Sequence, residues 1–347
     1  MTANVVGIDI GSASVRAVEV SDAGHSRPTL VRYHEVPLPD GAVSRGEVLE
    51  PNTVASALKQ LWSTGGFKSK NVVLGIGNHR VVARDLSLPK MSLKRIRESL
   101  PFQAQDMISV PVAEALLDFY PISESDGDDG PHVNGLLVAA VKEAVLGNVQ
   151  AVELAGLNPV DVDLIAFALS RSIFRGAQSG DAVVQIDIGA GTTTVVITYA
   201  GTPQFVRLIP TGGQDLTRAL MQRLEISEDQ AEVLKRSERY VSTPLGQETA
   251  ASVIREVTTE LLNSLRNTVN YFVNTRNAVP VSRIVLTGGG ARLAGFAEAL
   301  TEITRLPVLA PDPSQSVGLG RGVRADAFRQ TQSTYLVALG LALGSVA

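Results

Sequence analysis

Two acidic residues at the ends of apolar runs are the side chains in this sequence best suited to chemistry. Asp9 follows the run Val5–Ile8, and Asp187 follows the run Val183–Ile186. An ionised carboxylate at the end of a buried strand is costly unless a cation or hydrogen-bond donors compensate it. Two such strands therefore predict one shared ion.

The two runs form an internal repeat, residues 5–14 against residues 183–192. Each copy is an apolar strand followed by Asp-x-Gly, small residues and a hydroxyl side chain. Glycine in a tight turn lets backbone N–H groups approach an anion closely, and hydroxyl groups add donors. The residues concerned are Gly11, Ser12, Ser14, Gly189, Gly191, Thr192, Thr193 and Thr194. An ordinary hairpin explains either copy alone, but two matched copies favour a pair of anion-binding turns.

A glycine triplet, Gly288-Gly289-Gly290, is the third candidate element. It follows a buried strand predicted at 283–286 and is expected to open a helix that runs to Thr304. Such a helix start would place backbone amides and a positive helix end beside a ligand. The triplet is a weak signal alone and a strong one as the third member of an ordered set.

The order of these three elements resembles the phosphate-one, phosphate-two and adenosine motifs of the actin, Hsp70 and sugar-kinase superfamily. The resemblance covers nearly the whole chain and implies a two-lobed α/β ATPase fold of the RNase H-like type, which closes on ATP or ADP with Mg²⁺. It implies that Asp9 and Asp187 hold Mg²⁺ through water, and that Asp187, with Asp163 as a weaker candidate, takes part in catalysis. The nucleotide-binding residues that it implies are Gly11, Ser12, Ser14, Arg16, Gly189, Gly191, Thr192, Thr193, Gly213, Glu232, Lys235, Arg236, Gly288, Gly289 and Gly290.

Arg16 stands where many relatives have Lys. Glu232, Lys235 and Arg236 resemble the purine and ribose contacts of the superfamily, but an ordinary surface helix with an i,i+3 charge pair explains the same residues.

Alternating and helical apolar patterns predict the elements that must position these residues. The predicted strands are 5–10, 14–20, 71–76, 115–122, 135–141, 160–163, 183–188, 192–198, 204–209 and 283–286. The predicted helices are 53–62, one that starts after Ser92, 142–155, 164–174, 214–224, 227–236, 250–274 and a buried one near 335–346. Ser92 should cap the helix after it, which should extend to Met107 or Ile108 with a kink at Pro101. Ser227 and Gln230 should form a capping box at the start of helix 227–236, and 123–131 should form a solvated hairpin tip.

These elements predict four units. The first lobe comprises 1–84 and 164–180, joined by a C-terminal helix at 333–347. The second lobe comprises 181–225 and 278–332, and 226–277 forms a helical subdomain. Residues 85–163 read as an α+β subdomain inserted in the first lobe.

The inserted subdomain is similar to the extra subdomain of FtsA and of the type IV pilus assembly proteins of the PilM family. The sequence 338–343 is similar to the PilM ending, and no long tail with a basic amphipathic helix follows, which argues against FtsA. The residues 102–105, Phe-Gln-Ala-Gln, depart from a more acidic Trp-Glu-containing run. The resemblance implies a cytoplasmic scaffold, peripheral at the inner membrane, that docks the N-terminal peptide of a PilN-like membrane protein. Further pilus assembly proteins and other copies of the chain are additional partners that it allows.

The groove for this peptide is expected between the inserted subdomain and the first lobe. Leu93, Ile96, Arg97 and Leu100 would flank it, because a helix there can offer apolar pockets and a cation to an extended peptide. The alternative is that Leu93, Ile96 and Leu100 form the core of the subdomain.

Composition and missing residue types narrow the function further. The net charge of −4 gives no attraction for nucleic acid, and the absence of cysteine with four scattered histidines argues against a zinc site. Helix 164–172 carries no Glu or Gln to orient water, so slow hydrolysis is expected if any. A cell-division filament protein like FtsA and a small-molecule kinase of the same superfamily are the rival interpretations.

Overall fold

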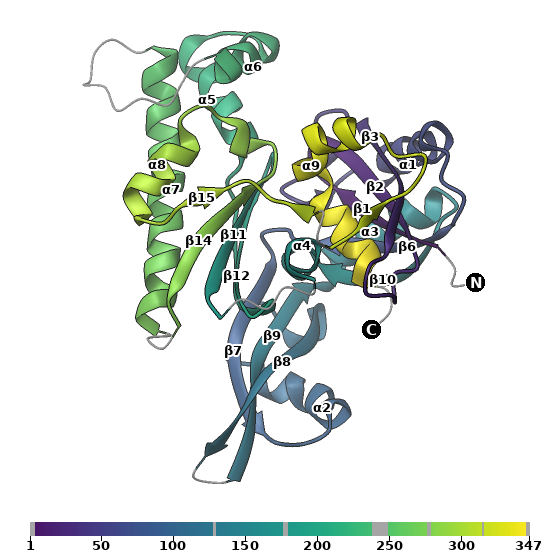
Figure 1. Cartoon of the computed structure of the whole chain (residues 1–347), viewed down its shortest axis with the longest axis vertical. Coiled ribbons are helices and arrows are strands. Elements are labelled where there is room, and N and C mark those ends of the chain that lie inside the picture. The colour runs from purple at the N-terminus through teal and green to yellow at the C-terminus, as the bar shows by residue number, and fades with distance from the viewer. Residues whose placement is uncertain are drawn as a thin grey trace.

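Two sheets form the centres of the two lobes (Figure 1). The computed structural model describes residues 4–127, 130–175, 180–237, 249–275, 279–313 and 316–344. The strands of the first sheet are β1 (Val5–Ile10), β2 (Ser14–Ser21), β3 (Thr29–Pro37), β6 (Asn71–Ile76), β10 (Asn158–Leu164) and β16 (Gly318–Leu319). The strands of the second sheet are β11 (Ala182–Ile188), β12 (Thr193–Tyr199), β13 (Thr202–Ile209), β14 (Val281–Thr287) and β15 (Val308–Leu309).

The two sheets share one topology. Their orders are β10-β6-β1-β2-β3-β16 and β15-β14-β11-β12-β13. β1 is antiparallel to β2 and parallel to β6, just as β11 is antiparallel to β12 and parallel to β14. The internal repeat therefore folds as two equivalent hairpins, and the predicted two-lobed α/β architecture is confirmed.

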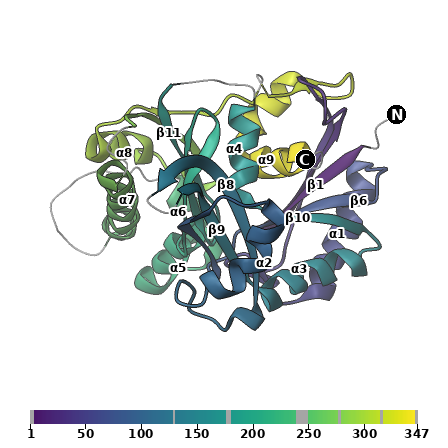
Figure 2. The ribbon, with the colours of Figure 1, turned by 90° about the horizontal axis from the view of Figure 1, so that it is seen from below.

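Helices cover the outer face of the first sheet and fill the space between the sheets (Figure 2). Helices α1 (Pro51–Gly65) and α3 (Lys142–Leu154) pack together on the outer face, where Leu58 and Val152 join one apolar core with β1 and β2. Helices α4 (Ile165–Phe174) and α9 (Ala325–Gly344) lie between the sheets. The last residues of the predicted C-terminal helix, 345–347, lie outside the described residues.

The crossing of α4 and α9 depends on one glycine. A Cβ atom at Gly340 would lie 1.7 Å from the carbonyl oxygen of Ala168, so any side chain there would force the helices apart. Because helix axes approach this closely only over very small residues, Gly340 sets the distance between the two helices that link the lobes.

The second lobe carries its helices on the face that points away from the first lobe. Helices α7 (Ala250–Thr275) and α8 (Phe296–Thr304) pack on its sheet through Leu265, Phe272 and Leu300. Helices α5 (Gly213–Leu224) and α6 (Glu228–Ser237) lie at the upper end of this lobe in Figure 1. The predicted capping box of α6 is confirmed, because the Gln230 N–H donates to Ser227 Oγ. The expected helix start at Gly290 is wrong, because a 3-10 turn at Gly290–Arg292 comes first and α8 begins only at Phe296.

A small sheet projects below the body. It has the order β7-β9-β8, with β7 (Val81–Pro89), β8 (Ala115–Gly127) and β9 (Gly130–Val141), and it carries α2 (Leu93–Gln103) and a 3-10 turn at Val112–Glu114. Ser92 caps α2 as predicted, but the helix ends at Gln103 and does not extend to Met107. The strands run further into the hairpin than the expected tip at 123–131, of which 128–129 lie outside the described residues.

The stretch expected as one inserted unit, 85–163, is divided between two sheets. Strand β10 pairs with β6 in the first sheet, and α3 packs against α1. The assignment of α3 and β10 to the inserted subdomain is therefore corrected, because the three-stranded sheet and α2 form their own core through Leu88, Phe119 and Leu137. The outer limits of the four predicted units remain a proposal.

A two-stranded hairpin, β4 (Val43–Ser44) with β5 (Glu47–Val48), reaches from the first lobe toward the second. Within the described ranges, no helix combines the length and apolar character that crossing a membrane requires.

Candidate functional site

A cavity of about 730 Å³ lies between the two lobes. It is lined from the first lobe by β1, β2 and α9, and from the second by the end of β11, by the loop that follows β14 and by α5, α6 and α7. Eleven predicted site residues line it together: Asp9, Arg16, Asp187, Gly189, Gly213, Glu232, Lys235, Arg236, Gly288, Gly289 and Gly290.

Asp9 and Asp187 both line this cavity, at equivalent ends of the central strands β1 and β11. Arg16 Nη1 lies 3.2 Å from Asp9 Oδ2, whereas Asp187 accepts a hydrogen bond of 2.7 Å from the Thr287 hydroxyl. Burial raises the pKa of Asp9, although Arg16 partly opposes the rise. Burial also raises the pKa of Asp187 to about 6, with Thr287 lowering it and the charge of Asp9 raising it further.

This pair of carboxylates fits a hard divalent cation such as Mg²⁺. Mg²⁺ is typically held by one or two carboxylates, with water and phosphate oxygens as its other ligands. The raised pKa values indicate that the two acids lack enough positive charge around them. Asp9 and Asp187 would hold the ion, and it would supply the charge that neutralises them and the phosphates of a ligand.

The glycine triplet has two roles. A Cβ at Gly288 would lie 2.4 Å from the Ile188 carbonyl oxygen, and one at Gly290 would lie 2.3 Å from the Ile188 side chain. Gly288 also has a φ of +85°, which disfavours any other residue. A Cβ at Gly289, by contrast, would meet nothing within 4 Å. Gly288 and Gly290 therefore let the loop pack on β11, and Gly289 leaves open space for a ligand.

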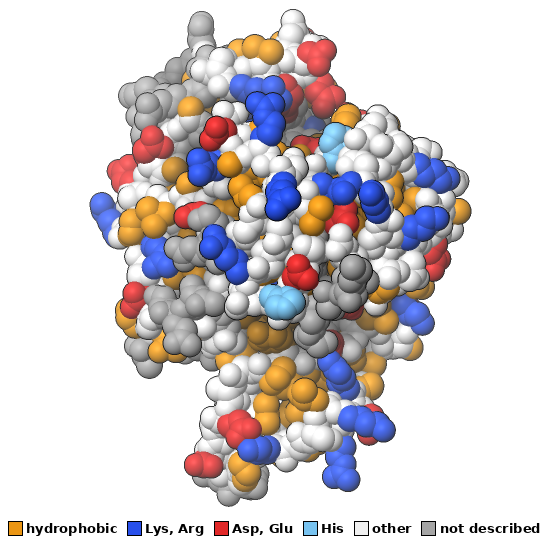
Figure 3. Space-filling model, turned by 45° about the vertical axis from the view of Figure 1, so that its right-hand side comes forward, with side chains coloured by type: hydrophobic (Ala, Val, Ile, Leu, Met, Phe, Trp, Pro, Cys, Tyr) orange, Lys and Arg blue, Asp and Glu red, His pale blue; other side chains and the backbone are white. Residues whose placement is uncertain are grey.

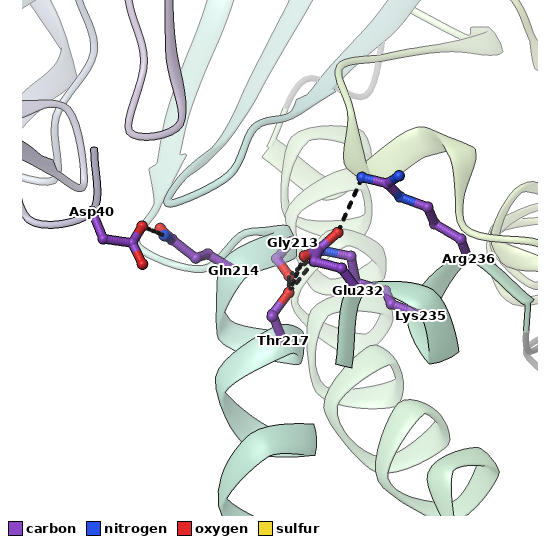
Figure 4. A network of polar contacts seen from close by, with 7 residues as sticks. All are labelled: Asp40, Gly213, Gln214, Thr217, Glu232, Lys235 and Arg236. Carbon is purple, nitrogen blue, oxygen red and sulfur yellow. Dashed lines mark hydrogen bonds and ion pairs between the residues drawn. The ribbon is translucent and has the colours of Figure 1, made fainter. Parts of the chain in front are cut away.

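A polar network joins α5 to α6 at the cavity wall (Figure 4). Lys235 Nζ donates to the Thr217 hydroxyl at 2.7 Å and to the Gly213 carbonyl at 3.3 Å, and it also pairs with Glu232. Arg236 approaches Glu232 from the other side at 3.5 Å. Burial alone would raise the pKa of Glu232, but hydrogen bonds from Lys235 and Thr217 and the nearby cations lower it overall. The network holds an ionised carboxylate and two cations at the cavity.

The start of α5 is bonded to the second hairpin. The N–H of Gly213 donates to the Gly189 carbonyl at 2.9 Å, and the N–H of Gln214 donates to the Ala190 carbonyl at 2.8 Å. The predicted ligand contact at Gly213 therefore cannot use its amide in this conformation, although the residue lines the cavity.

Several contacts cross directly between the lobes. Gln214 Nε2 lies 3.4 Å from Asp40 Oδ1, and Arg45 Nη2 lies 3.7 Å from Asp215 Oδ1. The two hairpin turns also touch, since a Cβ at Gly191 would lie 2.9 Å from Ser12 Oγ. The lobes are thus closed at the hairpins while the cavity remains beside them.

Some predicted residues do not line the cavity: Gly11, Ser12, Ser14, Gly191, Thr192, Thr193 and Asp163. The Ser14 hydroxyl donates to Glu35 at 2.6 Å, and the Thr193 hydroxyl donates to the Thr211 carbonyl at 2.7 Å. The Asp163 carboxylate pairs with Arg171. Asp163 stands two strands from Asp9 in the first sheet, roughly 10 Å away at the usual strand spacing. The weaker catalytic expectation for Asp163 is therefore not kept.

The predicted peptide groove needs a correction. Ile96 and Leu100 are fully buried in the core of the projecting sheet, so they cannot contact a partner. Leu93 is 46% exposed, and Arg97 is exposed and paired with Asp118 of β8 at 2.7 Å. Of the four expected groove residues, only Leu93 and Arg97 are accessible.

The sequence analysis missed several polar and charged residues of or beside the site, among them Glu35, Asp40, Gln214, Glu228, Arg292 and Thr334. Glu35 contacts Arg16, because the register of β2 with β3 sets the two residues opposite each other. Only a correct prediction of this register could have identified Glu35 from the sequence. Asp40 and Glu228 come from different lobes, and the Asp40 carboxylate raises the pKa of Glu228. No local pattern indicates such a pair.

Comparison with protein families gives one match over almost the whole chain. A family model described as "Type IV pilus assembly protein PilM" matches residues 7–346. Among curated proteins, the cell division protein FtsA of Bacillus subtilis is 22% identical over 353 residues, covering 89% of this chain and 78% of that protein.

Solved structures agree with this result. The PilM-PilN type IV pilus biogenesis complex contains a chain that superposes with a TM-score of 0.87 at 28% identity, with full coverage of both chains. MreB 5 of Spiroplasma citri bound to AMPPNP superposes with a TM-score of 0.53 at 14% identity, covering 98% of this chain and 95% of that one. The second likeness concerns the fold alone.

Proposed function

This chain belongs to the type IV pilus assembly protein PilM family, and from that premise we propose that it is a nucleotide-binding scaffold. In this proposal it binds ATP or ADP with Mg²⁺ in the interlobe cavity, and the nucleotide controls closure of the lobes. The closed form docks the N-terminal peptide of a PilN-like membrane protein, which holds the scaffold at the cytoplasmic face of the inner membrane.

The observation that carries the nucleotide proposal is the meeting of Asp9 and Asp187 at one cavity. They come from two equivalent hairpins, and the glycine loop and the Lys235 network line the same space. A cavity of about 730 Å³ is within the usual range for small-molecule sites. The fold shared with MreB 5, which was solved with AMPPNP, supports the same assignment.

Calorimetric titration with Mg-ATP tests the nucleotide proposal. We expect Asp9→Ala to weaken binding by about 1–3 kcal/mol, because it removes a charge-assisted contact. Asp326→Ala, which changes an exposed carboxylate on α9 outside the cavity lining, is the matched control and should bind like the unaltered protein. Equal affinity of the Asp9 variant and the control would contradict the proposal.

The partner proposal rests on β8, the outer strand of the projecting sheet. β8 is at the edge in the order β7-β9-β8, so its outer N–H and C=O groups have no neighbouring strand in the part of the chain that the structure describes. An extended peptide can add to such an edge. Leu116 of β8 is 43% exposed, and hydrophobic side chains gather where the projecting sheet meets the body (Figure 3). The PilM-PilN complex, with its TM-score of 0.87, supports a partner of the PilN type.

A fluorescence titration with the N-terminal peptide of a PilN-like protein tests this surface. Leu116→Asp should reduce peptide affinity at least about tenfold, since it places a charge in an apolar contact. Leu309→Asp alters a leucine of similar exposure, 47%, in the second lobe, and should have no effect. If both variants bind the peptide equally well, β8 is not the docking edge.

Hydrolysis is proposed to be slow. The first turn of α4 carries Ile165, Ala166 and Phe167, none of which can orient water, and Asp163 is held by Arg171. ATP would then act chiefly as a marker of the closed state. A steady-state turnover well above about 1 per second, a low value among enzymes, would contradict this part of the proposal.

An FtsA-like filament role is the second candidate, because the curated relatives include FtsA of Bacillus subtilis. Sedimentation with ATP separates the two functions. Pelleting of the protein on its own would favour the filament, whereas a monomer that binds the peptide would favour the scaffold.

A further inference from the structure

Three charged residues lie side by side on neighbouring strands of the first sheet. The register sets Asp9 of β1 opposite Arg16 of β2, and Arg16 opposite Glu35 of β3. Directly opposed residues point to the same face of a sheet. We call Asp9, Arg16 and Glu35 the charge row. Only its Asp9 and Arg16 members line the cavity, and Glu35 stands behind them.

Arg16 is shared unequally by the two acids. Its Nε lies 2.9 Å from Glu35 Oε1, and its Nη1 lies 3.2 Å from Asp9 Oδ2. Glu35 is itself held by the Ser14 hydroxyl at 2.6 Å. A guanidinium has separate donors for two acceptors, so it can give up one acid while keeping the other. The longer contact, to Asp9, is the one more easily released.

The second lobe has no such row. At the equivalent register, Asp187 is opposite Thr194, and Thr194 is opposite Leu208. The strand pairing is the same in both lobes, so the fold does not require a cation or a second acid at these positions. The charge row is therefore particular to the Asp9 side of the cavity, which indicates that it serves the function of that side.

We propose that Arg16 is a built-in counter-ion for Asp9 in the metal-free cleft, and that Glu35 is a positioning residue that retains Arg16 when Asp9 is released to a divalent cation. This inference rests on the proposed nucleotide function. Arg16 and the cation compete for one carboxylate. Moving Arg16 away from Asp9 would leave a half-buried cation without a partner, which is costly, unless Glu35 keeps it paired.

The test measures, by calorimetry at a fixed ADP concentration, how ADP binding depends on the Mg²⁺ concentration. ADP is chosen because it offers one phosphate fewer than ATP as an alternative partner for Arg16. In Glu35→Gln, Arg16 has Asp9 as its remaining anionic partner in the row, so the Mg²⁺ concentration for half-maximal binding should rise about tenfold. Binding of ADP in EDTA should not weaken, because the variant removes a negative charge near the phosphates.

Two controls separate this effect from general changes in charge or packing. In the Arg16→Gln background, Glu35→Gln should change the Mg²⁺ requirement by less than about twofold, since Glu35 acts through Arg16. Glu19→Gln breaks another ion pair of β2 and β3, that with Arg32 at 2.8 Å, and should leave the Mg²⁺ requirement unchanged. Should Glu35→Gln fail to fold, Glu35→Asp, which keeps the charge on a shorter side chain, should raise the requirement by a smaller factor.

The outcomes are distinct. An unchanged Mg²⁺ requirement in the folded Glu35 variants, or an equal rise in the Arg16→Gln background, overturns the inference while the nucleotide function stands. Failure of the unaltered protein to bind ADP or ATP at any Mg²⁺ concentration overturns both. A rise in the Mg²⁺ requirement that is absent from the Arg16→Gln background supports the proposed release of Asp9 from Arg16 to the cation.

Discussion

Asp187 occupies the position in the second lobe that Asp9 occupies in the first, but its neighbours are hydroxyl groups. Thr287 donates to its carboxylate, and Thr194 stands opposite it on β12. Arg16, which pairs with Asp9, acts on Asp187 only through its charge at longer range. Burial without an adjacent cation raises the pKa of Asp187 to about 6.

This pKa predicts a pH-dependent penalty in the ligand-free protein. The pKa of Asp187 in the folded state, about 6, is above its ordinary value of 3.8. The contribution of this residue to the free energy of unfolding is therefore fully present below pH 3.8 and is lost as the pH rises to about 6. Asp187→Asn removes the ionisation. Its free energy of unfolding in EDTA, relative to that of the unaltered protein, should therefore increase across this window by up to about 3 kcal/mol. Denaturant titrations at pH 4 and pH 7 measure the difference.

A difference that does not change between the two pH values would contradict this assignment. Asp326→Asn, which alters a carboxylate on α9 that is 94% exposed, is the control. Its effect on unfolding should be small at both pH values.

The crossing of α4 and α9 decides how the first lobe is joined to the second. Gly340→Ala places a methyl group against the Ala168 carbonyl, and we expect a loss of about 1–3 kcal/mol in the free energy of unfolding because the helices must separate. Chemical denaturation followed by circular dichroism measures it. Gly344→Ala, on the same helix, meets only the end of the Arg171 side chain and should cost less than about 1 kcal/mol. Equal losses would argue against a tight crossing.

Helix α2 illustrates the same dependence on packing. Its apolar residues Ile96 and Leu100 face β8 and β9, while Leu93 and Arg97 remain accessible. The helix was expected from its spacing, but which of its residues meet a partner depends on where the small sheet lies. The docking surface that we propose is therefore the edge of β8 and not α2.

At the scale of the whole molecule, the Arg45–Asp215 pair links the hairpin of β4 and β5 to the start of α5 across the cleft, at 3.7 Å. Arg45→Ala should increase the dissociation rate of bound nucleotide by about two- to fivefold, because a partly exposed pair contributes up to about 1 kcal/mol. Stopped-flow measurements with a fluorescent ADP analogue test this.

The matched control for that measurement is Arg80→Ala. The Arg80–Glu47 pair, at 3.6 Å, lies wholly within the first lobe. Arg80→Ala should leave the dissociation rate unchanged. Similar rates for the two variants would show that Arg45 does not help to hold the lobes closed.

The sequence by itself determined the local features of this protein. Strands ending in Asp-x-Gly, the Ser92 and Ser227 caps, and the order of the three motifs are set by residues close together in the chain, so their patterns could be recognised. The two-lobed fold followed from that order, and the family followed from the resemblance of the inserted subdomain and of residues 338–343; both were confirmed. Asp9 and Asp187 line one cavity, and the Mg²⁺ that they were expected to share stays a proposal.

Only the tertiary structure decided what depends on distant segments. The register of β2 with β3 sets Glu35 beside Arg16, and the pairing of β10 with β6 takes α3 and β10 into the first lobe. The burial of Ile96 and the ion pair of Asp163 with Arg171 likewise require neighbours far along the chain. Each of these contacts depends on how whole strands and helices pack, and a short stretch of sequence carries no record of what lies opposite it.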